Sequence, residues 1–115
     1  MSDCVFCNII EGKIPSTLVY ENEHIIAFKD INPQAPTHLL IVPRKHISTT
    51  MDIMEEDMKD IIPEVFAAVK HLAGQFNLEQ GGFRVVNNCG KDGGQTVDHL
   101  HFHLLGGRQL TWPPG

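Results

Sequence analysis

Asp98-His99-Leu100-His101-Phe102-His103-Leu104-Leu105 is the most informative stretch of this 115-residue chain. Histidine and apolar residues alternate, and successive side chains of a β-strand point to opposite faces of the sheet. The pattern predicts a strand that carries the three histidines on one face and packs Leu100, Phe102 and Leu104 into a core on the other. Three side chains that titrate near neutral pH then lie in a row on a rigid element.

The remaining sequence predicts an α+β domain around that strand. We expect a short helix at 5–11, closed by Gly12, and further strands at 17–20, 25–29, 39–42 and 83–86. Apolar residues recur at spacings of three and four over 52–76, which indicates the main helix. Together these elements predict an antiparallel sheet of about five strands with one long and one short helix, in a single domain spanning 1–115.

The start and the middle of the main helix need separate comment. Asp52 followed by Glu55 resembles a capping box. Pro63 interrupts the apolar period, because proline lacks the N–H that an internal helical position requires. We therefore expect either a kink there or a short first helix that ends near Ile62.

Composition excludes several classes of function. The formal net charge is −5 with neutral histidines, which argues against a nucleic-acid-binding protein. No apolar run is long enough to span a membrane, and the N-terminus has no secretory pattern. Three cysteines, an odd number, make a disulfide framework improbable, so we expect a reducing, cytoplasmic setting.

The histidine row admits three interpretations. It can bind a metal, form a solvated polar strand face, or supply a nucleophile. A single ion held by all three histidines fits poorly, because a strand separates His99 from His103 by about 13 Å. Neutral imidazole is a good nucleophile towards phosphorus, and neighbouring histidines can donate hydrogen bonds to phosphoryl oxygens.

A glycine-rich loop at 88–96 leads directly into the histidine row. Glycines allow backbone N–H groups to approach a phosphate closely. Such a loop is weak evidence alone, and it strengthens the phosphoryl-transfer interpretation because the histidine row follows it.

Together these segments resemble the histidine triad (HIT) family. His99 to Leu105 matches the pattern His-φ-His-φ-His-φ-φ, where φ is apolar. The stretches 28–38, 93–97 and 106–115 are similar to corresponding segments of the Hint branch of that family. Since several separate motifs agree and cover almost the whole chain, the sequence is identified as similar to Hint-type nucleoside phosphoramidases.

The resemblance implies roles for the residues that match its motifs. His101 corresponds to the nucleophile, which forms a covalent nucleotidyl-histidine intermediate, and the backbone carbonyl of His99 orients it. His103 contacts phosphate oxygens, the Thr96 hydroxyl contacts the bridging or leaving-group atom, and His38 supports proton transfer.

The same resemblance implies a nucleotide-binding set for an AMP-type purine nucleotide. Its members are Phe28, Asp30 (on the ribose hydroxyls) and Ile31 for the nucleoside, and Asn88, Gly94 and Gln95 on the phosphate side. Without the resemblance, Phe28 and Ile31 also fit core positions, and Asp30 and Asn88 also fit turns. His38 equally fits a structural histidine.

A second constellation begins at the N-terminus. Cys4 and Cys7 form a C-x2-C pair, which is half of a typical zinc site. His46 and His99 are candidates for the other two ligands, and some HIT proteins hold zinc in this way. A structural zinc that plays no part in the chemistry is expected, with no organic cofactor. Alternatively, the two cysteines are simply small thiols.

The resemblance also implies a homodimer, in which two sheets join edge to edge and the segment around Trp112 reaches the partner's site. Pairing would protect an exposed sheet edge. Two other functions stay open. One is a dinucleoside polyphosphate hydrolase with the same residues, and the other is a nucleotide- or zinc-binding interaction module without catalysis.

Overall fold

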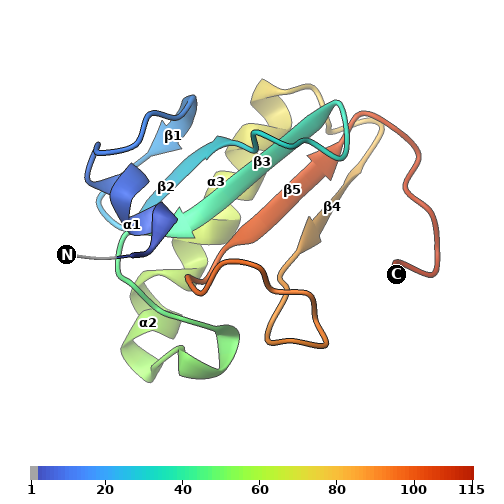
Figure 1. Ribbon diagram of the computed structural model, residues 1–115. Helices are drawn as coiled ribbons and strands as arrows, with labels where there is room; N and C mark the ends of the chain where they lie inside the picture. The colour runs from blue at the N-terminus through green and yellow to red at the C-terminus, as the bar shows by residue number, and fades with distance from the viewer. Residues whose placement is uncertain (1–2) are drawn as a thin grey trace.

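The computed structural model describes residues 3–115 as a five-stranded antiparallel sheet with helices on both faces. The strands are β1 (Leu18–Glu21), β2 (Ile25–Lys29), β3 (Thr37–Pro43), β4 (Phe83–Val86) and β5 (Phe102–Gly106), in the spatial order β1-β2-β3-β5-β4. Figure 1 shows the sheet with the short helix α1 (Val5–Ile10) in front of it and the long helix α3 (Ile62–Gln75) behind it. The predicted fold class is confirmed.

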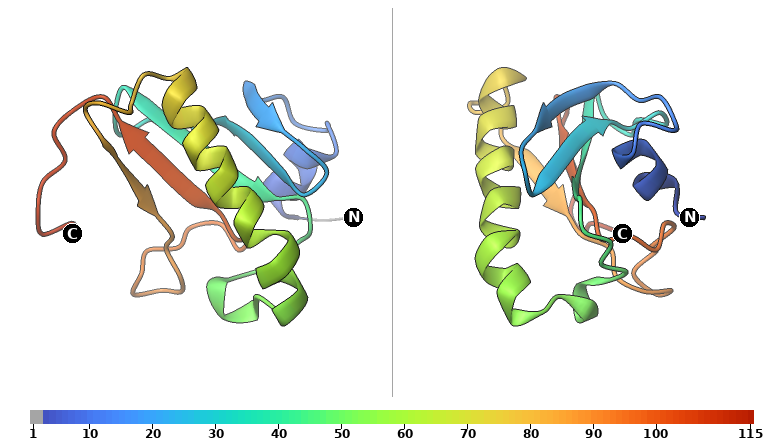
Figure 2. Two further views of the ribbon diagram at one scale, coloured as in Figure 1. Left: turned by 180° about the vertical axis from the view of Figure 1, so that it is seen from behind. Right: turned by 90° about the vertical axis from the view of Figure 1, so that its left-hand side faces the viewer.

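Alternation along the strands produces two apolar layers, one on each face of the sheet. Leu39 and Ile41 of β3 belong to the larger core beneath α3, whereas Leu40 and Val42 belong to a smaller core under α1. The right-hand view of Figure 2 shows α3 and α1 on opposite sides of the strands. Because α1 is short and covers little of its face, that face has room for a pocket.

The main helix is divided at Ile61, just before Pro63, in agreement with the second of the two predicted alternatives. A 3-10 turn at Thr50–Asp52 and α2 (Glu55–Asp60) precede α3, and Pro63 lies in the first turn of α3. An N–H is not needed there, so proline is tolerated. The predicted capping box from Asp52 to Glu55 is wrong: Asp52 Oδ2 instead accepts the backbone N–H of Thr49.

The histidine row is only partly strand, which corrects the prediction. Regular pairing begins at Phe102, so His99 and His101 precede β5. The alternation nevertheless holds, because Leu100, Phe102 and Leu104 lie in the core beneath α3. Phe6, on the α1 side of the sheet, packs edge-on against the rings of both His99 and His101.

Other boundaries agree closely with the sequence analysis. Strand β4 spans the predicted residues, α1 ends one residue earlier than predicted, and Gly12 follows it with a φ of +78°. Met58 and Phe66 fit the apolar period of the main helix, but their side chains are 55% and 48% exposed. No helix within residues 3–115 has the length and apolar character needed to cross a bilayer.

Candidate functional site

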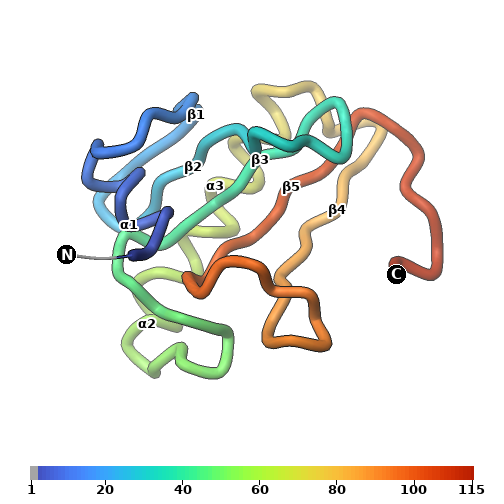
Figure 3. The backbone as a smooth tube through the Cα atoms, viewed as in Figure 1, coloured from blue at the N-terminus to red at the C-terminus, as the bar shows by residue number. Residues whose placement is uncertain are grey.

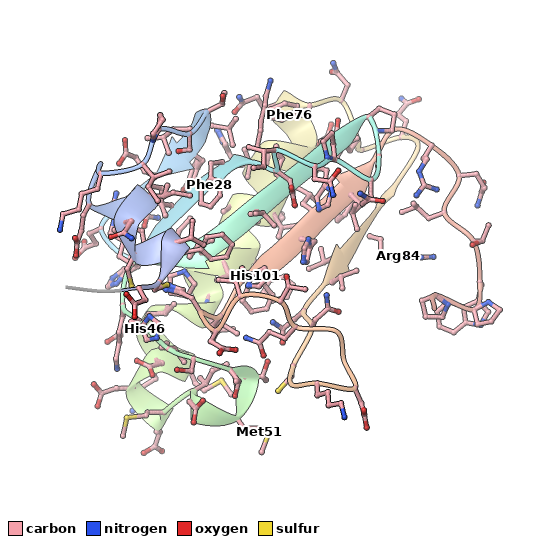
Figure 4. The ribbon with its side chains drawn as sticks, viewed as in Figure 1. Phe28, His46, Met51, Phe76, Arg84 and His101 are labelled. Carbon is pink, nitrogen blue, oxygen red and sulfur yellow. The ribbon has the colours of Figure 1, made fainter. Side chains whose placement is uncertain are left out.

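A cavity of about 460 Å³ lies between α1 and the sheet. The sheet register forms its floor, because Phe28 on β2 is paired with Leu40 on β3, which is paired with His103 on β5. In Figure 4 the labelled side chains of Phe28 and His101 lie on the same side of the sheet as α1. The cavity is therefore enclosed by the short helix and by strand residues that point away from the main core.

Most of the predicted catalytic and nucleotide-binding residues line this one cavity, namely Phe28, Asp30, Ile31, His38, Thr96, His101 and His103. The other three of that set, Asn88, Gly94 and Gln95, lie in the loop before the histidine row and outside that lining. Gln95 uses its side chain to hold the loop: Nε2 donates to the carbonyls of Ser48 and Val97, and Oε1 accepts the Gly90 N–H. Figure 3 traces this loop between β4 and β5.

The hydrogen bonds of His101 determine its tautomer. Its Nδ1 lies 2.7 Å from the carbonyl oxygen of His99, and a carbonyl can only accept, so Nδ1 carries the proton and donates it. Neutral His101 therefore keeps a lone pair on Nε2. The ring is 4% exposed and lines the cavity, so this lone pair belongs to an oriented imidazole.

His38 and His103 form a second oriented pair. The Gln34 N–H donates to Nδ1 of His38 at 3.0 Å, so neutral His38 carries its proton on Nε2. That nitrogen lies 2.8 Å from Nδ1 of His103 and 3.3 Å from Oδ2 of Asp30. When His38 donates to His103, the neutral ring of His103 carries its own proton on Nε2, where it can donate to a ligand.

Burial keeps these imidazoles neutral. The pKa of His103 is lowered to about 4, chiefly by desolvation and also by the neighbouring His101 and His38, against the opposing effect of Asp30. Desolvation also lowers the pKa of His38, against the opposing effect of Asp30. At neutral pH, His103 and His38 are therefore uncharged hydrogen-bonding groups.

Four residues converge at the other end of the histidine row. Cys4, Cys7, His46 and His99 each place a potential metal ligand atom within 4.8 Å of the other three. The Nδ1 atoms of His46 and His99 are 3.1 Å apart, Cys7 Sγ lies 3.2 Å from His46 Nδ1, and Cys4 Sγ lies 3.3 Å from His99 Nδ1. A tetrahedral zinc ion has Zn–N bonds of about 2.0–2.1 Å and Zn–S bonds of about 2.3 Å, which separate its ligand atoms by about 3.3 to 3.8 Å. The three pairs are a few tenths of an ångström closer than that, so small side-chain shifts would form a closed site.

The tautomer of His99 supports the same assignment. Its Nε2 lies 2.8 Å from the Pro43 carbonyl oxygen and must donate to it, which leaves the Nδ1 lone pair directed at the sulfur atoms. A histidine that ligates a metal through one nitrogen usually donates the other N–H to a carbonyl or carboxylate in this way. Desolvation lowers the pKa of His99, which favours the neutral form that a metal needs.

Asp30, His38 and His103 also lie close enough to be considered as metal ligands. The Gln34 N–H argues against this. A metal on Nε2 of His38 would force the proton onto Nδ1, where it would face that N–H donor. The group is therefore better suited to share a proton than to hold an ion.

Sequence reasoning missed several residues that shape the site. Phe6 lines the cavity and lies edge-on to His101, with ring centroids 5.0 Å apart. In the sequence, the position of Phe6 between Cys4 and Cys7 was the one feature that pointed to a role in the site. Asn87 donates from Nδ2 to the carbonyl of His101, and the Gln34 N–H acts from the backbone, where no side-chain pattern reveals it.

Comparisons with known proteins agree with this geometry. The family model described as "HIT domain" matches residues 11–110. A maize protein named "14 kDa zinc-binding protein" is 50% identical over 99% of this chain and 89% of its own length. An Arabidopsis thaliana protein named "Adenylylsulfatase HINT1" is 44% identical over 99% of this chain and 78% of its own.

Solved structures give the same answer. The crystal structure of a HIT family hydrolase from Legionella pneumophila superposes with a TM-score of 0.95 at 50% identity, covering 98% of this chain and all of the other. The matched domain, the identity over nearly the full length and the shared fold establish that this chain belongs to the HIT family.

Proposed function

We propose that this protein is a hydrolase that cleaves the P–N bond of purine nucleoside 5′-phosphoramidates, such as conjugates of AMP with an amine. The observation that carries the proposal is the orientation of His101: its Nδ1 donates to a carbonyl, so the lone pair of the neutral ring is on Nε2, and the residue lines the cavity. Imidazole in that state is a competent nucleophile at phosphorus near neutral pH.

The cavity offers a separate region for each part of such a substrate. Phe28 and Ile31 supply apolar surface for a base, and Asp30 supplies acceptors for ribose hydroxyls. His103 and Thr96 lie on the same cavity as His101, where they can donate to phosphate oxygens and to the leaving group. From the family resemblance, we assign the backbone around Asn88, Gly94 and Gln95 to the phosphate side.

The reaction proceeds in two displacements. Nε2 of His101 bonds to the α-phosphorus while the P–N bond to the amine breaks, and the amine leaves with the electron pair and a proton. Water then attacks phosphorus, the bond to Nε2 breaks, and nucleoside monophosphate and the free imidazole result. The leaving amine must be protonated, and the histidines around His101 can pass a proton to it.

Other leaving groups fit the same nucleophile. The Arabidopsis relative carries the name of an adenylylsulfatase, which implies sulfate as the leaving group of that protein. A dinucleoside polyphosphate hydrolase would use a nucleotide instead. Turnover of an adenosine 5′-phosphoramidate, adenylyl sulfate and diadenosine polyphosphate by one preparation ranks these alternatives, and turnover of none would favour a binding module.

We also propose that Cys4, Cys7, His46 and His99 hold a zinc ion. The four ligand atoms all lie within 4.8 Å of one another, and the maize relative is named for zinc binding. When bound, zinc cross-links the N-terminal segment to the loop after β3 and to the histidine row. It supplies no group to the cavity in which His101 lies.

We also propose a homodimer that forms through the edge of the sheet at β4 and the exposed aromatic side chains. Strand β4 lies at one edge of the sheet, and Phe66, Phe83 and Trp112 are 48%, 42% and 81% exposed. An unpaired strand edge and exposed aromatic side chains are both stabilised by a partner.

Replacing His101 with alanine tests the proposed nucleophile. Wild-type protein should release a fluorogenic amine from an adenosine 5′-phosphoramidate. His101→Ala should lose several orders of magnitude in kcat, because it loses the Nε2 lone pair, whereas the Nε2 of His103 carries a proton. His71→Ala, on α3 behind the sheet, is the matched control. Retained AMP binding by His101→Ala shows that the pocket is intact, and unchanged turnover in this variant contradicts the proposal.

The lowered pKa of His103 predicts a pH dependence of stability. Unfolded histidine titrates near 6.5 and folded His103 near 4, so the unfolded chain binds more protons in between. Stability is then complete above about pH 6.5 and falls as the pH drops towards about 4. Urea titrations in EDTA should show that the unfolding free energy of His103→Gln falls less steeply with decreasing pH over this window than that of wild type. The difference in slope corresponds to at most about one bound proton per chain. His24→Gln is the control, and parallel slopes for wild type and His103→Gln would refute the assignment.

Zinc content is measured directly. Protein purified without chelators should contain about one zinc per chain, and Cys4→Ser and Cys7→Ser should each contain far less, because a serine hydroxyl is a poor zinc ligand. Cys89→Ser removes a thiol outside the cluster and should keep its zinc. Equal metal content in all four proteins would rule out this site.

Light scattering tests the homodimer. At micromolar concentration the mass should be twice the 12.8 kDa of one chain. Phe83→Lys, which puts a charge beside the open edge of β4, should shift the protein towards the monomer. A monomeric wild-type mass would contradict the proposal.

A further inference from the structure

We infer that the cluster of Cys4, Cys7, His46 and His99 is a positioning device for the nucleophile, so that loading it with zinc sets the catalytic rate although the metal contacts no substrate. The inference rests on the proposed function, and it departs from the expectation that zinc is dispensable for the chemistry. Two connections lead from the cluster to His101, one through the backbone of His99 and one through helix α1.

The first connection runs through the backbone of His99. The His99 ring is fully buried, with one nitrogen facing the cluster and the other held by the Pro43 carbonyl. The carbonyl of the same residue accepts the Nδ1–H of His101 at 2.7 Å. Any rotation of His99 that follows loss of its metal partner therefore moves the acceptor that fixes the tautomer of the nucleophile.

The second connection runs through α1. Phe6 lies between the two cysteines in sequence, and its ring packs edge-on against His101, with centroids 5.0 Å apart, and against Phe28, with centroids 5.6 Å apart. The same ring lines the cavity. The two thiols thus lie on the helix turn that presses Phe6 onto the nucleophile and closes the nucleoside end of the pocket.

Helix α1 contains six residues, of which Phe6 is buried, while Ile9 and Ile10 are partly buried against the smaller core. A helix this short is not stable without tertiary anchors. Its N-cap is Cys4, whose sulfur accepts the N–H of Cys7 at 3.3 Å, so the group that caps the helix is also a ligand in the cluster. Ligation should therefore fix the helix and its cap together.

The alternative is that the cluster adds global stability and nothing more. In that case, protein that remains folded after metal removal keeps its kcat. If the cluster positions the nucleophile, folded but metal-free protein loses kcat, because displacing reacting groups by about 1 Å can cost about 100-fold in rate. The two accounts differ only in folded protein, so circular dichroism must confirm folding at the assay temperature.

The experiment compares wild type, Cys7→Ser, Phe6→Leu and Cys89→Ser. Zinc content, kcat and KM for the phosphoramidate, and long-range ¹H–¹⁵N spectra of the imidazole nitrogens are measured for each. Wild type is also measured after a chelator removes its metal. The spectra report the protonated Nδ1 of His101 without any substrate, so they remain informative if the phosphoramidate is not turned over.

We expect Cys7→Ser and metal-free wild type to lose about 10- to 100-fold in kcat, with the His101 Nδ1–H signal shifted or broadened. Phe6→Leu should keep its zinc and still lose kcat, which separates the helix connection from metal binding itself. Cys89→Ser should match wild type in every measurement.

The inference is overturned if metal-free wild type is folded and keeps both its kcat and its His101 signal. A kcat in Phe6→Leu equal to that of wild type refutes the helix connection and leaves the His99 backbone as the route that supports the inference. If loaded wild type turns over no phosphoramidate, the proposed function fails instead, and the response of the His101 signal to metal removal then decides the inference alone. If Cys7→Ser does not fold, chelated wild type and zinc-loaded Phe6→Leu carry the comparison.

Discussion

The hydrogen bond from His101 Nδ1 to the His99 carbonyl is the interaction on which the site depends. It fixes one tautomer, aims the lone pair of Nε2 into the cavity, and uses backbone rather than a side chain to do so. A backbone acceptor cannot ionise and cannot rotate independently, so the orientation of the nucleophile follows the path of the chain at residue 99. Because the ring of the same residue points into the cysteine–histidine cluster, the two sites share one peptide.

Neutrality is the second constraint. The site contains several imidazoles within hydrogen-bonding distance of one another, and charging more than one would be costly in a poorly hydrated pocket. Burial lowers the pKa values of His38, His99 and His103, so each ring acts as a donor at one nitrogen and an acceptor at the other. Backbone groups decide which nitrogen donates. The carbonyls of Pro43 and His99 each accept a ring N–H, and the N–H of Gln34 donates to the ring of His38.

The alternation of histidine and apolar residues predicted which side chains share a face, and β4 was predicted to the residue. The start of β5 was predicted incorrectly, and the reason is local. Pro43 has no N–H with which to extend the ladder, and its carbonyl is taken by the ring of His99. The Leu100 N–H instead reaches the carbonyl of Ile47, and the Asn87 side chain caps the carbonyl of His101. Residues 99–101 therefore form their hydrogen bonds with side chains and a loop in place of a neighbouring strand. The spacing of apolar residues in the sequence carries no signal for such contacts.

The candidate metal ligands could be proposed from spacing and family resemblance, whereas Phe6 could not. Its importance comes from where α1 lies against the sheet, which is a long-range property of the fold. Pro63 shows the opposite case, because its position restricts the helix locally and one of two stated alternatives was correct.

The two-sided sheet also limits how this protein can change over time. Leu104 and His103 are neighbours in the chain, yet one lies in the core beneath α3 and the other faces the cavity. A slip of one residue in β5 would send imidazoles into the apolar core and leucines into the pocket. Single substitutions along this strand alter either folding or chemistry, but a one-residue insertion or deletion destroys both at once. The register of β5 therefore constrains the length of this strand more tightly than it constrains any one of its side chains.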